Sequence, residues 1–203
     1  MRIVAIVLAA GAGRRIGGPK ALLRLGDRSF LAHACGALQR PGVGSVVAVI
    51  GAEAVRVRAE ADLPGEVVVV ENRRWREGML SSVWDGLGGA EALGAEAVLL
   101  HPVDHPLIAT KTVDRVVGAL EDGAFAAIPS HDGRRGHPGG FGKAAFAALR
   151  AAPPDRGARA VLRAHPGRVV HVEGDPGCLI GIDTAADLER LRTRDGGGRP
   201  AGL

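Results

Sequence analysis

The residues best suited to chemistry stand in a glycine-rich segment near the start of the chain. This segment reads Leu8-Ala9-Ala10-Gly11-Ala12-Gly13-Arg14-Arg15-Ile16-Gly17-Gly18-Pro19-Lys20. Its glycines let the backbone approach a ligand closely, and Arg15 and Lys20 supply positive charge. The combination is suited to phosphate groups, although an ordinary tight turn with surface arginines would have a similar composition.

Two common phosphate-binding loops fit this segment poorly. A dinucleotide-binding loop has the spacing GxGxxG, whereas three residues separate Gly13 from Gly17 here, and no acidic residue ends a second strand near residue 31. A Walker A loop needs Lys followed by Ser or Thr, whereas Lys20 precedes alanine. An NAD-linked oxidoreductase is therefore the least favoured enzyme class.

A second group of polar residues follows the apolar segment at 97–100. Asp104 stands where a carboxylate at a strand end could hold Mg²⁺ opposite a triphosphate. His101 and His105 could form a transition-metal cluster with it, but neighbouring residues on an extended segment point to different faces. Asp104 is therefore the first candidate for a metal ligand, with a turn residue as the alternative.

The glycine-rich segment resembles the signature Leu-Ala-Ala-Gly-x-Gly-x-Arg-x-Gly-x-x-Lys of the MobA-like NTP transferase family. Further segments resemble, in order, blocks of its molybdenum cofactor cytidylyltransferase branch. They are Asn72-x-x-Trp75-x-x-Gly78-Met79-x-Ser81-Ser82-Val83, Asp104-x-Pro106-Leu107, Arg135-Gly136-His137-Pro138, Asp155-x-Gly157-Ala158-Arg159 and Ile182-Asp183-Thr184. The resemblance spans about residues 3–192.

The resemblance implies a magnesium-dependent nucleotidyltransferase with an NTP wrapped by the glycine-rich segment. The residues expected to bind the nucleotide are Leu8, Ala9, Ala10, Gly11, Gly13, Arg15, Lys20, Asn72 and Ser81. Arg15, Lys20 and Asp104 are the expected catalytic residues, and Asp183 is the expected second Mg²⁺ ligand. For Asp183 and Ser81, helix capping is the alternative role.

The acceptor is expected to contact the Arg-Gly-His-Pro block. Arg135 could pair with an acceptor phosphate, and His137 could touch the acceptor or shape its loop. In the resembling family, alanine at position 10 tends to accompany cytidine over guanine. The resemblance therefore implies transfer of CMP from CTP to the phosphate of molybdenum cofactor (molybdopterin), with release of pyrophosphate. A molybdoenzyme or its chaperone is a further candidate partner.

One departure from the family pattern keeps other functions open. The family usually reads Asp-Ile-Asp-Thr where this chain has Gly181-Ile182-Asp183-Thr184, so one carboxylate is missing. A nucleotidyltransferase for another small phosphorylated acceptor, such as a sugar or polyol phosphate, uses the same type of loop. A catalytically silent protein that binds nucleotide or cofactor is the other alternative.

The elements that must position these residues follow from the apolar pattern. Short continuous apolar runs predict strands at 3–9, 46–50, 67–70, 97–100, 124–128 and 169–172. Helical spacing predicts helices at 29–39, 52–61, 80–93, 110–120, 143–149, 158–164 and 184–192. This alternation predicts a three-layer α/β/α sandwich with a Rossmann-like, mostly parallel sheet, of the nucleotide-diphospho-sugar transferase type. Ligands are then expected beyond the carboxyl ends of the strands.

Composition limits the remaining possibilities. The 203 residues suit one domain over 1–193, and the Gly- and Arg-rich residues 194–203 are expected to form a flexible tail. The scattered arginines behind the net charge of +4 and the 3% aromatic content argue against a nucleic-acid partner. No segment is apolar for the ~20 residues that a membrane span needs. Two distant cysteines, Cys35 and Cys178, favour a cytoplasmic location.

Overall fold

The structure is a computed structural model that describes residues 1–196, with side chains through residue 193. Its main strands are β1 (Ile3–Ala9), β4 (Val43–Ile50), β5 (Val67–Glu71), β6 (Ala97–Pro102), β7 (Ala126–His131), β8 (Arg134–Arg135), β9 (Gly139–Gly142) and β10 (Val169–Glu173). A small antiparallel hairpin consists of β2 (Arg24–Leu25) and β3 (Arg28–Ser29). The helices are α1 (Phe30–Leu38), α2 (Ala54–Glu60), α3 (Met79–Ala92), α4 (Thr110–Glu121), α5 (Phe146–Arg150), α6 (Ala158–Ala164) and α7 (Ala185–Gly196).

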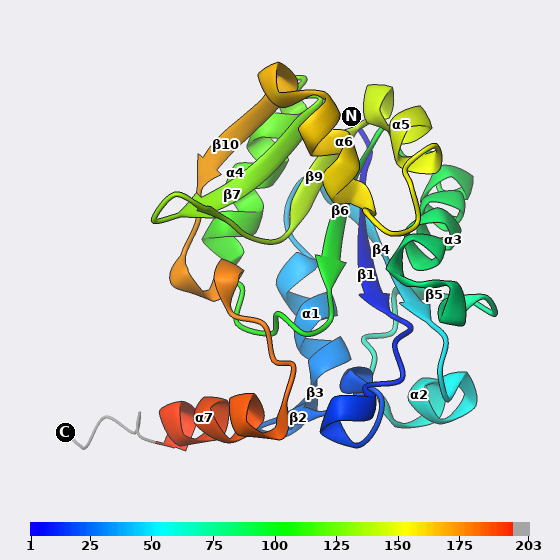
Figure 1. Ribbon diagram of the computed structural model, residues 1–203, viewed down its shortest axis with the longest axis vertical. Helices are drawn as coiled ribbons and strands as arrows, with labels where there is room; N and C mark the ends of the chain where they lie inside the picture. The colour runs from blue at the N-terminus through cyan, green and yellow to red at the C-terminus, as the bar shows by residue number, and fades with distance from the viewer. Residues whose placement is uncertain (197–203) are drawn as a thin grey trace.

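The main sheet lies between two layers of helices, which confirms the predicted three-layer α/β/α fold (Figure 1). Its eight strands follow the order β10-β7-β9-β6-β1-β4-β5, with β8 paired to β7 outside this path. Strands β1, β4, β5 and β6 pair in parallel, as do β7 and β10. The sheet is therefore mostly parallel, as predicted.

Strand β1 shows why continuous apolar runs predicted this arrangement. All seven of its residues are buried, because successive side chains point to opposite faces and both faces are covered. Ile3, Ala5 and Val7 pack in the core with α1 and α4, whereas Val4 and Ile6 pack in the core with α3, α5 and α6. A strand with two covered faces has no need of polar positions.

The antiparallel strand β9 was not predicted. It lies between β6 and β7 and pairs with both in the antiparallel direction. A Cβ atom at Gly140 would lie 2.7 Å from Val116 Cγ1 of α4, and one at Gly142 would lie 2.7 Å from the carbonyl oxygen of Ala124. Glycine is needed here because its neighbours come close, and the same glycines removed the apolar pattern that signals a strand.

The predicted helices and parallel strands are present, with ends that differ by a few residues. The predicted helix at 143–149 begins as a 3₁₀ turn at Lys143–Ala145 and continues as α5. Helix α7 runs to Gly196, so residues 194–196 of the expected flexible tail are helical, and 197–203 lie outside the described residues. Among the helices described, none is long and apolar enough to cross a membrane.

The carboxyl ends of β1, β4 and β6 meet at one edge of the sheet, toward α7 in Figure 1. Backbone hydrogen bonds continue beyond the strands there. The N–H of Val103 donates to the Leu8 carbonyl (3.1 Å), and the N–H of Ala52 donates to the Ala10 carbonyl (2.9 Å). The loop after β1 is thereby held next to the loop after β6, which brings the glycine-rich segment close to Asp104.

Candidate active site

The glycine-rich loop after β1 folds into a compact turn around Gly13. This residue has a φ of 57°, and a Cβ atom on it would lie 1.8 Å from the carbonyl oxygen of Gly18. The N–H groups of Ile16 and Gly18 both donate to the Gly13 carbonyl, at 2.9 and 3.2 Å. Only glycine can occupy position 13 without moving the backbone. The loop lines a cavity of about 590 Å³, which we call the first cavity.

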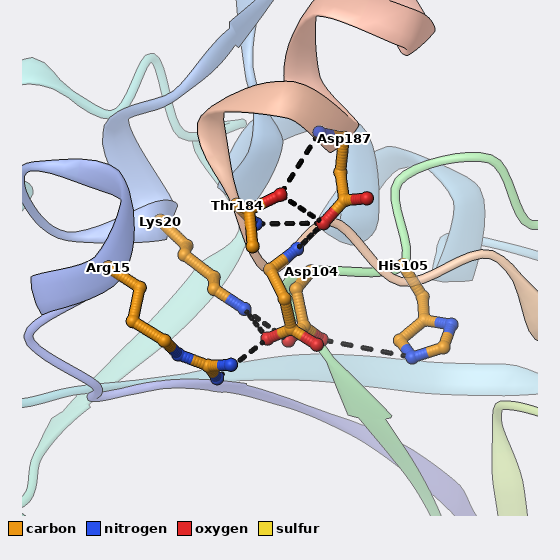
Figure 2. Close-up of polar contacts among 7 residues, drawn as sticks. Arg15, Lys20, Asp104, His105, Thr184 and Asp187 are labelled. Carbon is orange, nitrogen blue, oxygen red and sulfur yellow. Dashed lines mark hydrogen bonds and ion pairs between the residues drawn. The ribbon is translucent and has the colours of Figure 1, made fainter.

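Arg15, Lys20, Asp104 and Asp183 form a charged centre through their ion pairs (Figure 2). All four residues line the first cavity. Lys20 Nζ donates to Asp104 Oδ2 and to Asp183 Oδ1, each at 2.7 Å, and Arg15 Nη2 donates to Asp183 Oδ1 at 3.1 Å. The hydrogen bond from Lys20 holds the pKa of Asp183 below its ordinary value. Two carboxylates and two cations therefore neutralise one another.

The segment that carries Asp183 is fixed by the start of α7. Asp187 Oδ2 accepts hydrogen bonds from the Asp183 N–H (3.1 Å), the Thr184 N–H (2.8 Å) and the Thr184 hydroxyl (2.8 Å). These bonds, led by the one from the Thr184 hydroxyl, lower the pKa of Asp187 to about 2. Thr184 Oγ1 in turn accepts from the Asp187 N–H at 3.2 Å. Thr184 and Asp187 cap the helix, which leaves the Asp183 carboxylate directed at Lys20.

A second cavity of about 710 Å³ adjoins the first. The two cavities share Leu8, Met79, Pro102, Asp104 and Asp183 in their walls. Apolar side chains from four elements form much of the second cavity, namely Val83, Ile128, Phe141 and Leu162. Asp104 and Asp183 thus stand where the two cavities meet, so a ligand in one cavity could react with a ligand in the other at these carboxylates.

Residues 5–169 match the MobA-like NTP transferase domain. The chain belongs to this family. It contains a nucleotidyltransferase domain, and the glycine loop, the two carboxylates and the paired cavities form the candidate site of that domain.

Several known proteins match most of the chain. The bifunctional enzyme IspD/IspF of Rhizorhabdus wittichii is 36% identical over 95% of this chain, which spans only 56% of that relative's length. Nicotine blue oxidoreductase of Paenarthrobacter nicotinovorans is 35% identical over 93% of this chain and 96% of its own. A molybdenum cofactor guanylyltransferase of Acidiphilium cryptum is 32% identical over 91% of each chain.

Solved structures show the same MobA-like fold. Rv0371c from Mycobacterium tuberculosis superimposes with a TM-score of 0.80 at 28% identity, over 95% of this chain and 99% of that chain. Its complex with manganese gives a TM-score of 0.71 at 27% identity, over 95% of this chain and 99% of that chain.

The charged centre fits the divalent cation that MobA-like nucleotidyltransferases typically use. Asp104 Oδ1 is buried and has no hydrogen-bond partner, and Asp104 Oδ2 and Asp183 Oδ1 already share one cation, the Lys20 ammonium. Hard divalent cations such as Mg²⁺ prefer one or two carboxylates, with phosphate and water oxygens in the other positions. Among the described residues no group of three or more His, Cys, Asp or Glu could hold a metal ion, so the remaining ligands would come from substrate and solvent.

Two of the residues predicted to bind the nucleotide lie beneath the cavity wall instead. Asn72 is fully buried, and its amide nitrogen donates to Ser81 Oγ (2.8 Å) and Ser82 Oγ (2.9 Å) while its Oδ1 accepts from the Arg74 N–H (2.8 Å). The Ser81 hydroxyl bonds to the Gly78 carbonyl at 2.8 Å. These bonds hold the segment between β5 and α3, and Ser82 is the serine that reaches the first cavity.

The predicted loop residues divide between cavity and core. Ala9 packs in the core on the side of α1. The cavity is lined by the remaining predicted loop residues, Leu8, Ala10, Gly11, Gly13, Arg15 and Lys20.

Three histidines near the charged centre are uncharged at neutral pH, of which His101 is fully buried and His105 and His137 are half-buried. Burial lowers the pKa of His101 and of His137 to about 3, and it also lowers the pKa of His105. His101 Nε2 lies 3.1 Å from the carbonyl oxygen of His105, so this nitrogen carries the proton and Nδ1 is left bare. His101 therefore helps to fix the loop that carries Asp104, and the geometry does not favour a zinc cluster of His101, Asp104 and His105.

Both residues predicted to bind the acceptor line the second cavity. Arg135 is exposed and supplies positive charge, whereas His137 is neutral and could only exchange hydrogen bonds with a ligand. Sequence reasoning missed other lining residues, namely Met79, Arg156, Arg159 and Arg163. Arg159 stands in a segment that resembles a family block, whereas no motif marks Arg163.

Proposed function

We propose that the chain transfers CMP from CTP to the phosphate of molybdenum cofactor and releases pyrophosphate. The observation that carries this proposal is the position of Asp104 and Asp183 at the junction of two cavities, with the glycine loop lining one of them. The first cavity would hold the nucleotide and the second the acceptor. In the reaction, an acceptor phosphate oxygen bonds to the α-phosphorus of CTP as the bond to the bridging oxygen of pyrophosphate breaks.

The side chains of the charged centre suit this displacement. Nucleotidyl transfer brings two anions together, so positioning and positive charge matter more than a strong base. Lys20 Nζ lies at the end of the glycine loop, and its ammonium can move from the carboxylates to phosphate oxygens in the first cavity. Arg15 is exposed at the same cavity and can follow. Mg²⁺ held by Asp104 and Asp183 would polarise the α-phosphate.

The choice of CTP and of this acceptor rests on two features. Ala10 lines the first cavity, and we infer that alanine instead of glycine at this position leaves less room for a larger purine base. The second cavity is large and mostly apolar at its base, which suits an acceptor with an extended organic body beyond its phosphate. A cytoplasmic location belongs to the same proposal, and the buried free thiols of Cys35 and Cys178 are compatible with it.

A redox reaction is the second candidate. The likeness to nicotine blue oxidoreductase covers nearly the full length of both proteins, at 35% identity. An NAD-linked redox reaction would need a nicotinamide dinucleotide in place of an NTP, and hydride transfer would give the paired carboxylates no direct part. The two candidates therefore differ in whether the carboxylates matter.

The deciding experiment measures pyrophosphate release by the purified protein with each NTP, Mg²⁺ and molybdenum cofactor. Release with CTP that is lost in Asp104→Ala, and kept in Asp114→Ala, would establish the transferase and its nucleotide. Asp114 is a matched control because its carboxylate pairs with Arg40 on the surface. Parallel reactions with sugar and polyol phosphates, and with NADH or NADPH and a dye, cover the alternatives. Turnover there but not with molybdenum cofactor would overturn the proposed acceptor.

A further inference from the structure

The second cavity has more positive charge than one acceptor phosphate needs. Arg156 precedes α6, and Arg159 and Arg163 lie one turn apart on it, and all three line the cavity. We call these three residues the α6 arginines. Lys20 already neutralises Asp104 and Asp183 where the two cavities meet, and Arg135 also lines the second cavity, so the α6 arginines add to the positive charge there.

The α6 arginines have few partners within the protein. Arg156 Nε lies 3.8 Å from Asp155 Oδ2, and both side chains are mostly exposed, so this contact is weak. Among the described side chains, no carboxylate oxygen lies within 4.0 Å of the Arg159 or Arg163 guanidinium. Arg159 lines the same cavity as His137. A cavity lined by one sign of charge attracts the opposite charge.

The α6 arginines stand on a rigid support. Val161 and Leu162 of α6 are buried in the core between the sheet and α3 and α5. The turn before the helix is closed by the N–H groups of Arg156 and Gly157, which both donate to the Pro153 carbonyl at 3.0 Å. Residues 159 and 163 are four apart, so they face the same side of the helix. The charges are therefore presented together without any ligand to order the backbone.

We propose that the α6 arginines bind a second anionic group of the acceptor, separate from the phosphate that reacts. This inference rests on the proposed function and specifies the class of acceptor. The acceptor would have a reactive phosphate near Asp104 and Asp183, an apolar or flat middle over Phe141 and Leu162, and an oxyanion at the α6 arginines. Guanidinium groups suit this role because they bind oxyanions with two parallel hydrogen bonds.

Binding of a small probe tests the arginine site without any turnover. Naphthalene-1-sulfonate combines a flat apolar body with one oxyanion, and naphthalene-1-sulfonamide is its neutral counterpart. Isothermal titration should show that Arg159→Gln/Arg163→Gln weakens sulfonate binding by about tenfold or more, as loss of charge-assisted hydrogen bonds predicts. The sulfonamide should bind both proteins equally. Equal sulfonate binding by both proteins would overturn the proposal.

Two further variants control for net charge and for fold. Arg58→Gln/Arg134→Gln removes the same charge from exposed positions outside the cavity and should bind the sulfonate like the wild type. Arg159→Lys/Arg163→Lys keeps the charge but loses the two parallel hydrogen bonds, so it should recover part of the affinity. A loss of affinity in the Arg58 and Arg134 variant as large as in the Gln variant would show a general charge effect and would also overturn the proposal.

Steady-state kinetics separate this proposal from the proposed function. With CTP and an accepted acceptor, Arg159→Gln/Arg163→Gln should raise the acceptor KM about tenfold or more and leave the KM for CTP unchanged. A raised KM for CTP with an unchanged acceptor KM would assign these arginines to the nucleotide and refute the inference. Arginine-dependent sulfonate binding by a protein that turns over no NTP would support the site while the transferase proposal failed.

Discussion

The charged centre and the α6 arginines hold positive charge at the same pair of cavities in opposite ways. In the charged centre every charge has an opposite partner, at 2.7 Å for Lys20 with Asp104 and Asp183 and at 3.1 Å for Arg15 with Asp183. Among the side chains that the structure describes, the one carboxylate contact of the α6 arginines is the 3.8 Å contact between Arg156 and Asp155. The charged centre is ordered by its own ion pairs, whereas the α6 arginines are positioned by the packing of their helix. Substitutions in the two groups should therefore have different consequences.

The largest expected effect comes from breaking the charged centre at Asp104. Asp104→Asn keeps the shape of the side chain but removes the charge that Lys20 and a divalent cation would share. We expect pyrophosphate release to fall by at least about 100-fold in kcat, comparable to loss of one group that stabilises charge in a transition state. Asp114→Asn, which removes an exposed carboxylate, should change kcat little, and a similar loss in both variants would contradict the role of Asp104.

A smaller effect is expected from Lys20→Met. Loss of one charge-assisted hydrogen bond to phosphate should lower kcat/KM for CTP by about tenfold to a hundredfold. The same change removes the ammonium from between two carboxylates, so Mn²⁺ should bind more tightly in the absence of nucleotide, as followed by electron paramagnetic resonance. Lys111→Met, at an exposed position of α4, is the control. Weaker Mn²⁺ binding in Lys20→Met would show that lysine supports the metal site rather than competing with the metal.

The smallest effect concerns His101, which is fully buried near the charged centre. Burial lowers the pKa of His101 to about 3 in the folded protein, so the unfolded chain takes up the proton first as the pH falls below about 6.5. Protonation of the unfolded chain at this histidine therefore lowers the free energy of unfolding as the pH falls, by about 1 kcal/mol between pH 7 and 5.5.

Urea unfolding at the two pH values measures this term. His101→Gln can still donate to the His105 carbonyl but cannot be protonated, so its free energy of unfolding should change less between pH 7 and 5.5 than that of the wild type. An identical change in both proteins would mean that His101 is not the group that titrates.

The parallel half of the sheet was predictable because burial on two faces leaves a strong signal. The run at β1 is continuous and apolar for that reason. Strand β9 could not be found in the same way, because Gly-Gly-Phe-Gly has only one large apolar side chain. Its glycines are needed because α4 and the Ala124 backbone approach the strand closely. A strand made mostly of glycine has the composition of a turn, so the sequence does not mark it as a strand.

The site shows a similar division. The glycine loop brings Arg15 and Lys20 close to Asp104, because the loops after β1 and β6 follow adjacent parallel strands. Asp183 joins them because its segment is hydrogen-bonded to the loop that carries Asp104. Asn72 and Ser81 were placed by the same reasoning, yet they bond to each other in the interior. A polar residue after a strand can serve a ligand or its own loop, and only the direction of the side chain separates the two. Arg163 gave no signal because its role depends on where α6 packs.

The walls of the two cavities come from different stretches of the chain. Most of the first cavity is built from residues 8–20 and 75–82, whereas the part of the second cavity that carries Arg135, His137, Phe141 and the α6 arginines comes from the single stretch 128–163. Under the proposed function, substitutions within 128–163 would change how the acceptor is held and leave the residues proposed to hold the nucleotide untouched. The two specificities could then change independently of each other.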